Sequence, residues 1–282
     1  MKFASYFGPQ GPSFGLVRGE EIVDLSTRLS LPDLQALIAQ GLSAATDFAN
    51  RPADFAIAQV RFLPVMTAPR KIICVGVNYD EHRSEMGRQR AEYPTIFTRF
   101  ADTQIGHLQP LIRPHASAAL DYEGELAVII GRGGRTIPAA RALDAIAGYS
   151  CYNDASVRDW QRHTSQFIPG KNFPGTGAFG PYLVTADEVG DPQTLQLTTR
   201  LNGEVMQKAT TDLMIFPVRE LIAYISSFTP LLPGDVIITG TPSGVGAARN
   251  PPVFMKAGDV VEVEISRVGL LRNPVIDELK LS

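Results

Sequence analysis

The hydrophobic positions of this chain fall mostly into short runs that suit buried strands. Five runs are rich in β-branched or other apolar residues and have the length of a strand: 72–77, 122–130, 195–201, 236–239 and 260–265. Three segments have the spacing of helices, with apolar residues three or four apart: 31–40, 138–147 and 218–227. The pattern predicts a mixed α/β fold that is rich in strands, with helices at its periphery.

The first part of the chain differs from the rest. Residues 1 to about 66 combine short alternating runs with the helical pattern at 31–40. Pro64 and Pro69 then favour an extended connector, because a proline disfavours helical backbone at the residue before it. We therefore expect a small amino-terminal α+β domain over 1–66 and a larger domain over 67–282.

Composition narrows the class of protein. The 282 residues are 44% hydrophobic and 20% charged, which is enough for a substantial core. A net charge of -3 without basic clusters gives no field for a nucleic-acid backbone, and no apolar run approaches the length of a membrane span. The first residues lack a secretory pattern, and Cys74 and Cys151 are expected to be buried, reduced thiols. We expect a soluble, cytoplasmic protein that binds neither nucleic acid nor membranes.

Two glutamates stand at the start of the apolar run 122–130. In Glu123-Gly124-Glu125 they are two residues apart, so a strand places both side chains on one face, and Gly124 is expected to leave the opposite face open. Adjacent carboxylates repel each other unless a cation joins them, and hard divalent ions prefer such oxygen ligands. The pair indicates a metal site. The alternative is two exposed glutamates at the end of a strand.

A third carboxylate is expected from Asp154, which ends the short strand pattern at 149–154. The alternative is that Asp154 caps the helix that follows, since aspartate is a preferred N-cap residue. Three carboxylates without histidine or cysteine favour Mg²⁺ or Mn²⁺ over Zn²⁺. Such a site leaves coordination positions for the oxygens of a small 2-oxo acid.

His82 and Glu85 are three residues apart, so a helix brings the two side chains together and lets the carboxylate orient the imidazole. A pair of this kind can activate water or carry a proton. The alternative is an ordinary exposed histidine, because the surrounding segment 81–85 is polar.

Several motifs occur together and in a fixed order: Val75-Gly76-Val77-Asn78-Tyr79 with His82 and Glu85, Glu123-Gly124-Glu125, Asn153-Asp154 with Arg158 and Gln161, Gly170-Lys171-Asn172-Phe173, Gly180-Pro181, and 239–246. Over residues 71–277 the chain thereby resembles the fumarylacetoacetate hydrolase superfamily. Within it, the chain is similar to bacterial acylpyruvate hydrolases and 2-hydroxyhepta-2,4-diene-1,7-dioate isomerases.

The resemblance implies a β-sandwich roll with peripheral helices, assembled as a homodimer. It implies that Glu123, Glu125 and Asp154 bind the metal. The further residues that it implies are catalytic His82, Glu85, Lys171 and Gln161, and substrate-binding Arg158, Gly240 and Thr241. A solvated loop lysine is the alternative for Lys171, and a turn after a strand is the alternative for 240–241.

Members of this superfamily hydrolyse carbon–carbon bonds in acylpyruvates, while relatives decarboxylate or isomerise similar 2-oxo acids at the same metal. The resemblance therefore implies a hydrolase that cleaves a fumarylpyruvate- or maleylpyruvate-like diketo acid to pyruvate and a carboxylic acid, in the catabolism of aromatic compounds. A decarboxylase or double-bond isomerase on the same site is one alternative, and a non-enzymatic module that binds a metal or ligand is another.

Two positions depart from the superfamily pattern. Arg99 stands where many members have lysine, and Pro174 stands where many have aspartate, so both are expected to alter contacts with the substrate. The distal end of the substrate is expected to meet side chains from this set: Met86, Arg88, Arg90, Phe97 and Phe173.

Overall fold

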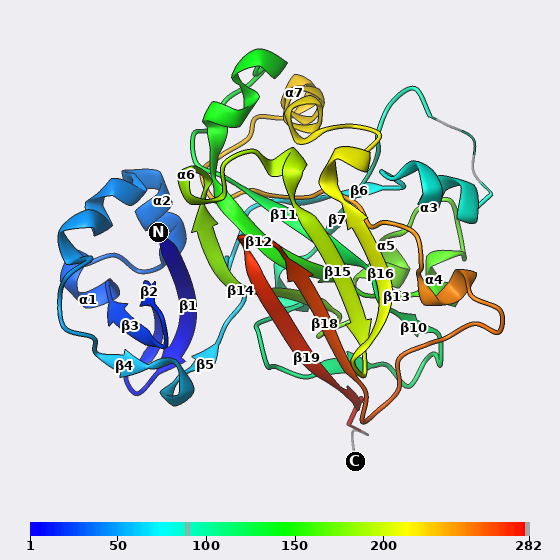
Figure 1. The fold of residues 1–282 in the computed structure, drawn as a ribbon, viewed down its shortest axis with the longest axis horizontal. Helices are drawn as coiled ribbons and strands as arrows, with labels where there is room; N and C mark the ends of the chain where they lie inside the picture. The colour runs from blue at the N-terminus through cyan, green and yellow to red at the C-terminus, as the bar shows by residue number, and fades with distance from the viewer. Residues whose placement is uncertain (88, 90, 280–282) are drawn as a thin grey trace.

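Most strands belong to one large sheet (Figure 1). The computed structural model describes residues 1–87, 89 and 91–279. The large sheet has 12 strands in the order β4-β3-β2-β1-β14-β12-β11-β17-β6-β7, with β5 beside β1 and β8 beside β14. These strands are β1 (Lys2–Gly8), β2 (Gly11–Arg18), β3 (Glu21–Asp24), β4 (Phe55–Ala56), β5 (Arg61–Phe62), β6 (Ile72–Gly76), β7 (Thr95–Arg99), β8 (Gln104–Ile105), β11 (Gly124–Ile130), β12 (Ile146–Asp154), β14 (Gly177–Thr185) and β17 (Val236–Ile238).

A second sheet has five strands in the order β16-β15-β18-β19-β9, and β10 pairs with β13. Their bounds are β9 (Leu111–Arg113), β10 (Leu120–Asp121), β13 (Ser156–Val157), β15 (Gln196–Leu201), β16 (Glu204–Thr210), β18 (Val260–Ile265) and β19 (Gly269–Asp277). The α-helices are α1 (Ser26–Leu29), α2 (Leu34–Gln40), α3 (Asp80–Glu85), α4 (Arg158–Gln161), α5 (Ile168–Lys171), α6 (Ala186–Val189) and α7 (Val218–Phe228). Short 3₁₀ turns are η1 (Leu42–Phe48), η2 (Ile57–Gln59), η3 (Ala101–Thr103), η4 (Ala139–Ala145), η5 (Pro192–Thr194), η6 (Thr211–Leu213) and η7 (Gly246–Ala248).

The two sheets enclose the main core. Figure 1 shows β15, β18 and β19 crossing in front of β11 and β12. Leu126 and Val128 of β11 are fully buried in one hydrophobic cluster with Leu197 of β15 and Val263 of β18. The strand-rich α/β fold with peripheral helices that the hydrophobic pattern predicts is confirmed.

Gly124 lies where the two sheets approach each other closely. A Cβ atom on Gly124 would lie 2.1 Å from Thr199 Oγ1 and 3.3 Å from Val263 Cγ1. The expectation that Gly124 leaves this face open is therefore wrong, because β15 and β18 cover it. The glycine is needed for close packing of backbone against the second sheet.

Two helical segments differ from the sequence prediction. The first begins at Leu34 rather than residue 31, because Asp33 caps it by accepting from the Ala36 amide at 2.8 Å. In the segment predicted as a helix at 138–147, residues 139–145 form the 3₁₀ turn η4 and residues 146–147 begin β12. The buried Ala142 and Ala145 of η4 are three apart, which matches three residues per turn. The helix expected at 218–227 is present as α7.

The amino-terminal region shares its sheet and part of its core with the rest of the chain. Strand β1 pairs with β14 through Lys2 opposite Val184 and Phe3 opposite Leu183. Leu37 of α2 belongs to the same buried cluster as Ala127 of β11. The boundary at residues 66 and 67 stays a prediction, and backbone hydrogen bonds of the large sheet connect the two sides.

Cys74 and Cys151 are buried and free, as expected. Among the described residues, no helix combines the length and the apolar character that crossing a membrane requires.

Candidate metal and catalytic site

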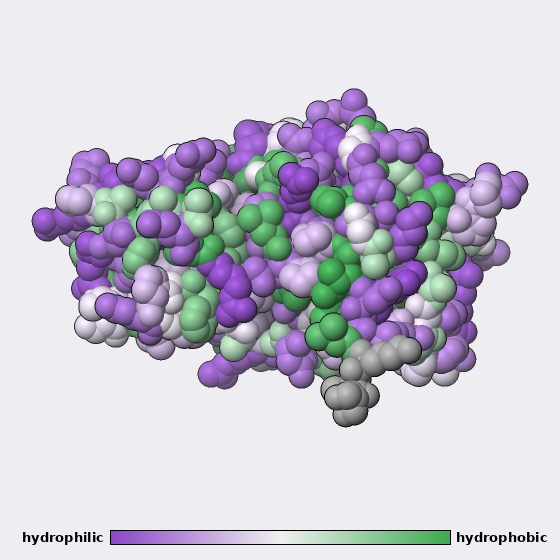
Figure 2. All heavy atoms as spheres, turned by 90° about the horizontal axis from the view of Figure 1, so that it is seen from below, coloured by the Kyte–Doolittle hydropathy of each residue, from purple (hydrophilic) through white to green (hydrophobic). Residues whose placement is uncertain are grey.

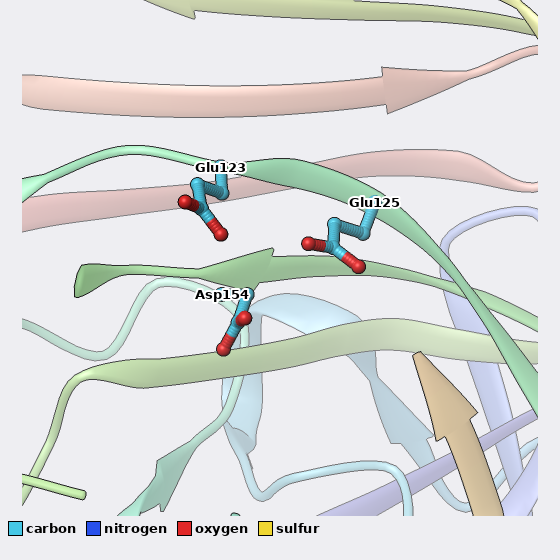
Figure 3. A group of neighbouring side chains, drawn as sticks. All are labelled: Glu123, Glu125 and Asp154. Carbon is cyan, nitrogen blue, oxygen red and sulfur yellow. The ribbon is translucent and has the colours of Figure 1, made fainter. Parts of the chain in front are cut away.

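Three carboxylates meet at the end of the β11–β12 pair (Figure 3). Glu125 lies in β11, Glu123 directly precedes that strand, and Asp154 ends β12. Antiparallel pairing of Gly124 with Asn153 brings the three side chains to one place. Each offers an oxygen within 4.8 Å of the others, and all three residues are buried. The grouping expected from the sequence is present, and the alternative of exposed glutamates is wrong.

Glu123 is compensated by two cations. Its carboxylate lies 2.6 Å from Lys171 Nζ and 2.6 Å from Arg158 Nη1. Burial raises the pKa of Glu123, but the two cations outweigh burial and hold that pKa at about 2. Glu123 is therefore ionised in the folded protein.

Glu125 has a different environment. In the described part of the chain, its carboxylate accepts one hydrogen bond, from the amide of Gly240, and has no ion pair within 4.0 Å. Burial raises the pKa of Glu125 well above its usual range, and the charges of Asp154 and Glu123 add to this effect. A divalent cation among the three carboxylates would supply the missing positive charge, and an all-oxygen donor set suits Mg²⁺ or Mn²⁺.

The carboxylate of Asp154 accepts hydrogen bonds from two cationic side chains and does not cap a helix. The donors are Arg99 Nη1 at 2.7 Å and Lys171 Nζ at 2.5 Å. Helix α4 has Val157 at its N-cap position, and no side chain caps it. The helix-capping alternative for Asp154 is wrong.

Lys171 is a buried part of this cluster. Besides its two carboxylate contacts, Nζ donates to the carbonyl of Asp154 at 3.3 Å. Burial lowers the pKa of Lys171, but Asp154 and Glu123 outweigh burial and raise the pKa above its usual value. These contacts favour the ammonium form of Lys171, and because the side chain is buried the alternative of a solvated loop lysine is wrong.

His82 and Glu85 form the expected pair on α3. His82 is 4% exposed, and its Nδ1 lies 3.0 Å from Glu85 Oε2. Glu85 Oε1 accepts from the Gly244 amide at 2.9 Å. Burial raises the pKa of Glu85, but these two hydrogen bonds outweigh burial and lower the pKa. Because ionised Glu85 can only accept, Nδ1 carries a proton and Nε2 is left to exchange protons with a substrate.

Arg158 connects the carboxylates to Asp121, a residue of the site that was not predicted from the sequence. Its Nε donates to Asp121 Oδ2 at 2.8 Å, and Nη1 donates to Gln161 Oε1 at 2.9 Å. Asp121, fully buried, also accepts from the amides of Gly246 and Ala247 at 2.8 and 2.9 Å. Arg158 Nη2 is buried without a hydrogen-bond partner among the described residues.

The loop after β17 supports the carboxylates. The amide of Gly240 donates a hydrogen bond to the Glu125 carboxylate. The Thr241 hydroxyl donates to the Gly124 carbonyl at 2.9 Å and accepts from Gln207 Nε2 at 2.8 Å. Substrate binding by Gly240 and Thr241 stays a prediction, and of the two only Thr241 lines the cavity.

One cavity of about 420 Å³ brings several of these groups together, although Glu85, Asp154 and Gly240 do not line it. Predicted site residues that line it are His82, Glu123, Glu125, Arg158, Gln161, Lys171 and Thr241. Of the side chains expected at the distal end of a substrate, Met86 and Phe97 line the cavity, while Phe173 packs edge-on against Trp160. Arg88 and Arg90 lie outside the described residues.

The two departures from the superfamily pattern, Arg99 and Pro174, lie outside the lining of the cavity, and their effect on substrate contacts stays a prediction. Arg99 is buried, and besides its contact with Asp154 its Nη1 donates to the Ala155 carbonyl at 3.1 Å and its Nη2 donates to Thr176 Oγ1 at 2.6 Å. Arg99 therefore contacts a candidate metal ligand, Asp154, rather than the substrate space.

The geometry can be compared with known proteins. The family described as fumarylacetoacetate (FAA) hydrolase C-terminal matches residues 71–276. The chain belongs to this family. It is therefore an enzyme of the fumarylacetoacetate hydrolase family, and the recognition of the superfamily from its motifs is confirmed.

Relatives within the family have several activities. A mitochondrial oxaloacetate tautomerase of Bos taurus is 38% identical over 288 residues, covering 98% of this chain and 92% of that protein. The structure of a fumarylacetoacetate hydrolase from Exiguobacterium antarcticum has a TM-score of 0.87 and 37% identity, covering 99% of this chain and 100% of that one. A maleylpyruvate hydrolase from Sphingobium sp. SYK-6, in complex with manganese(II) and pyruvate, has a TM-score of 0.83 and 30% identity over the same shares.

Proposed function

We propose that this enzyme binds Mg²⁺ or Mn²⁺ through Glu123, Glu125 and Asp154 and interconverts the keto and enol forms of a small 2-oxo acid of the oxaloacetate type. The observation that carries the proposal is that one cavity is lined both by the candidate metal ligands Glu123 and Glu125 and by His82. The near full-length similarity to an oxaloacetate tautomerase supports the substrate class.

Tautomerisation moves one proton between carbon and oxygen, and the site holds groups suited to each part. When bound, a divalent cation would supply Lewis-acid stabilisation of negative charge on the 2-oxo oxygen. His82 takes the proton from the carbon next to the 2-oxo group through Nε2, and ionised Glu85 stabilises the resulting imidazolium. The same proton is then returned to the enol oxygen, so the reaction consumes no co-reactant.

Two buried cationic side chains, Lys171 and Arg158, favour the binding of an anionic substrate. Lys171 stays protonated between Glu123 and Asp154, and its charge lowers the energy of enolate-like negative charge nearby. Arg158 Nη2 has no protein acceptor among the described residues, so it can donate to a substrate carboxylate. Gln161 is held by Arg158 at the cavity wall and offers its amide to the substrate or to water.

Hydrolysis of an acylpyruvate is the second candidate. The same His82–Glu85 pair, with 3.0 Å between Nδ1 and Oε2, can take a proton from water instead of carbon. Attack of that water on the distal carbonyl and cleavage of the carbon–carbon bond would give a carboxylic acid and pyruvate. The 30% identical maleylpyruvate hydrolase favours this reading.

One experiment separates the two candidates. Enol oxaloacetate is offered to the metal-loaded enzyme, and formation of the keto form is followed by its reduction with malate dehydrogenase and NADH. In parallel, acetylpyruvate and fumarylpyruvate are offered and pyruvate is quantified. Tautomerase activity above the metal-only background, abolished by EDTA and by His82→Ala, supports the first proposal. Pyruvate release without tautomerisation would replace it with the second.

We also propose that the enzyme is a cytoplasmic homodimer. Exposed apolar side chains lie near the carboxyl-terminal end, where Ile276 and Leu279 are 38% and 83% exposed. Figure 2 shows hydrophobic residues grouped beside this end on an otherwise mostly hydrophilic face. A grouped apolar surface is typical of an interface. Light scattering should give twice the chain mass of 30.6 kDa, and a monomer at micromolar concentration would contradict the proposal.

A further inference from the structure

The substrate cavity has a buried floor and an exposed mouth. Glu123, Glu125 and Lys171 line the floor and are between 1% and 5% exposed. Arg162 and Ser165 line the same cavity but are exposed, which places them at its mouth. A 2-oxo acid whose oxo-carboxylate end lies at the floor therefore directs its distal end towards the mouth.

Arg162 differs from the other cations of the cavity. Lys171 and Arg158 are each bound to two carboxylates at 2.5 to 2.8 Å. Across residues 1–87, 89 and 91–279, the guanidinium of Arg162 has no hydrogen bond or ion pair, although it lines the cavity. Its charge is thus available to a ligand, whereas most of the charge at the floor is already compensated.

The backbone that carries Arg162 is held in place. Its amide closes α4 by donating to the carbonyl of Asp159 at 3.1 Å. The preceding Gln161 packs so closely on Gly170 that a Cβ there would lie 2.4 Å from the Gln161 nitrogen. Arg158 and Gln161 on the same short helix face the same cavity. The helix therefore fixes the position of the Arg162 backbone, from which the side chain extends, relative to the floor of the cavity.

We propose that Arg162, assisted by the hydroxyl of Ser165, binds a distal carboxylate and so selects dicarboxylic 2-oxo acids over monocarboxylic ones. This inference rests on the proposed function, which places a 2-oxo acid at the floor. A guanidinium binds a carboxylate through two parallel hydrogen bonds, a geometry that a neutral end group cannot use. Because the mouth is open to solvent, screening limits the effect to about two- to fivefold in affinity.

The test measures binding, so that it does not depend on turnover. The Mn²⁺-loaded protein is titrated calorimetrically with 2-oxoglutarate and with 2-oxopentanoate, which have equal chain length and differ in the distal carboxylate. The wild type should prefer 2-oxoglutarate, and Arg162→Gln should reduce the ratio of the two affinities by about two- to fivefold. Arg162→Lys should keep part of the preference, because it keeps the charge but loses the two-pronged geometry.

Arg51→Gln is the matched control, because Arg51 is exposed, lies outside the cavity lining and gives the same change in net charge. An unchanged ratio in Arg162→Gln, an equal loss in Arg51→Gln, or a wild type without preference would each overturn the inference. If neither compound binds, both the inference about Arg162 and the proposed function are contradicted. If the preference depends on Arg162 but no 2-oxo acid is turned over, the recognition stands and only the proposed reaction is wrong.

Discussion

Glu125→Gln should make the metal-free enzyme more stable while removing its function. The Glu125 carboxylate is 2% exposed, lies beside Asp154 and Glu123, and accepts one hydrogen bond, from Gly240, among the described residues. Glutamine keeps an oxygen for the Gly240 amide and removes the charge. An uncompensated buried charge costs several kcal/mol, so we expect a gain of about 1–3 kcal/mol in the free energy of unfolding. For a chain of this size that is a rise in Tm of roughly 2–6 °C.

Glu123→Gln is the matched control, because it makes the same chemical change two residues away. Glu123 is bound by Lys171 and Arg158, each at 2.6 Å. Removing its charge leaves two buried cations less compensated, at a cost of about 3–5 kcal/mol. The two variants should therefore shift the metal-free stability in opposite directions, although both remove a candidate metal ligand.

Metal should reverse the order of the wild type and Glu125→Gln. Binding to the folded state alone adds about 4.1 kcal/mol when the free ion is at about 1,000 times its Kd, which exceeds the gain of the variant, and the variant lacks one ligand for the ion. Thermal and urea unfolding are measured in EDTA and in excess Mn²⁺. A variant that is less stable than the wild type in EDTA, or an order that Mn²⁺ leaves unchanged, would refute the charge argument.

The pH dependence of stability provides a second test of the direction of the change caused by Glu125→Gln. The pKa of Glu125 is raised in the folded state from an ordinary value of 4.5, so the folded protein binds the extra proton between these two values. Destabilisation by Glu125 is absent below pH 4.5, grows as the pH rises from 4.5 to the folded-state pKa, and is constant above that pKa. The advantage of Glu125→Gln in EDTA should therefore be largest at high pH and shrink as the pH falls.

Three further predictions follow from single contacts. His82→Ala should lower kcat by about 10²- to 10⁴-fold, because it removes the proton carrier, whereas unfolding in urea should change little. Gly124→Ala should lower the free energy of unfolding by about 1–3 kcal/mol in urea titrations, because the methyl group meets Thr199. Burial and Arg272 lower the pKa of His107 to about 4 from 6.5, so stability present above pH 6.5 is lost as the pH falls towards 4. His107→Gln should remove that part of the pH dependence of Tm.

The strands and the carboxylate group were predictable because both depend on local spacing. Period-two geometry at Glu123 and Glu125 needs nothing beyond the strand itself, and the β-branched runs match β6, β11, β15, β17 and β18 closely. The helical form of 138–147 was not predictable in the same way. Apolar residues three or four apart suit either helix type, and only packing in the folded protein selects the 3₁₀ form.

The cations of the site were harder to predict, because their partners are distant in sequence. Arg99 and Asp154 are 55 residues apart, and Arg158 and Asp121 are 37 apart, so no local pattern joins them. One signal was nevertheless present for Arg99. Alternation in β7 puts Phe97 and Arg99 on the same face of the strand, and both are buried, at 8% and 3% exposure.

A charged side chain on the buried face of a strand requires a partner of opposite sign inside the protein. Three clustered carboxylates make the same demand for positive charge, and a single divalent ion cannot meet it fully. The structure meets both demands together, since Arg99, Arg158 and Lys171 form ion pairs with Glu123 and Asp154, whereas no cation of the described residues forms an ion pair with Glu125. Counting buried charges of both signs therefore identifies Glu125 as the carboxylate whose buried negative charge depends most directly on the metal for compensation.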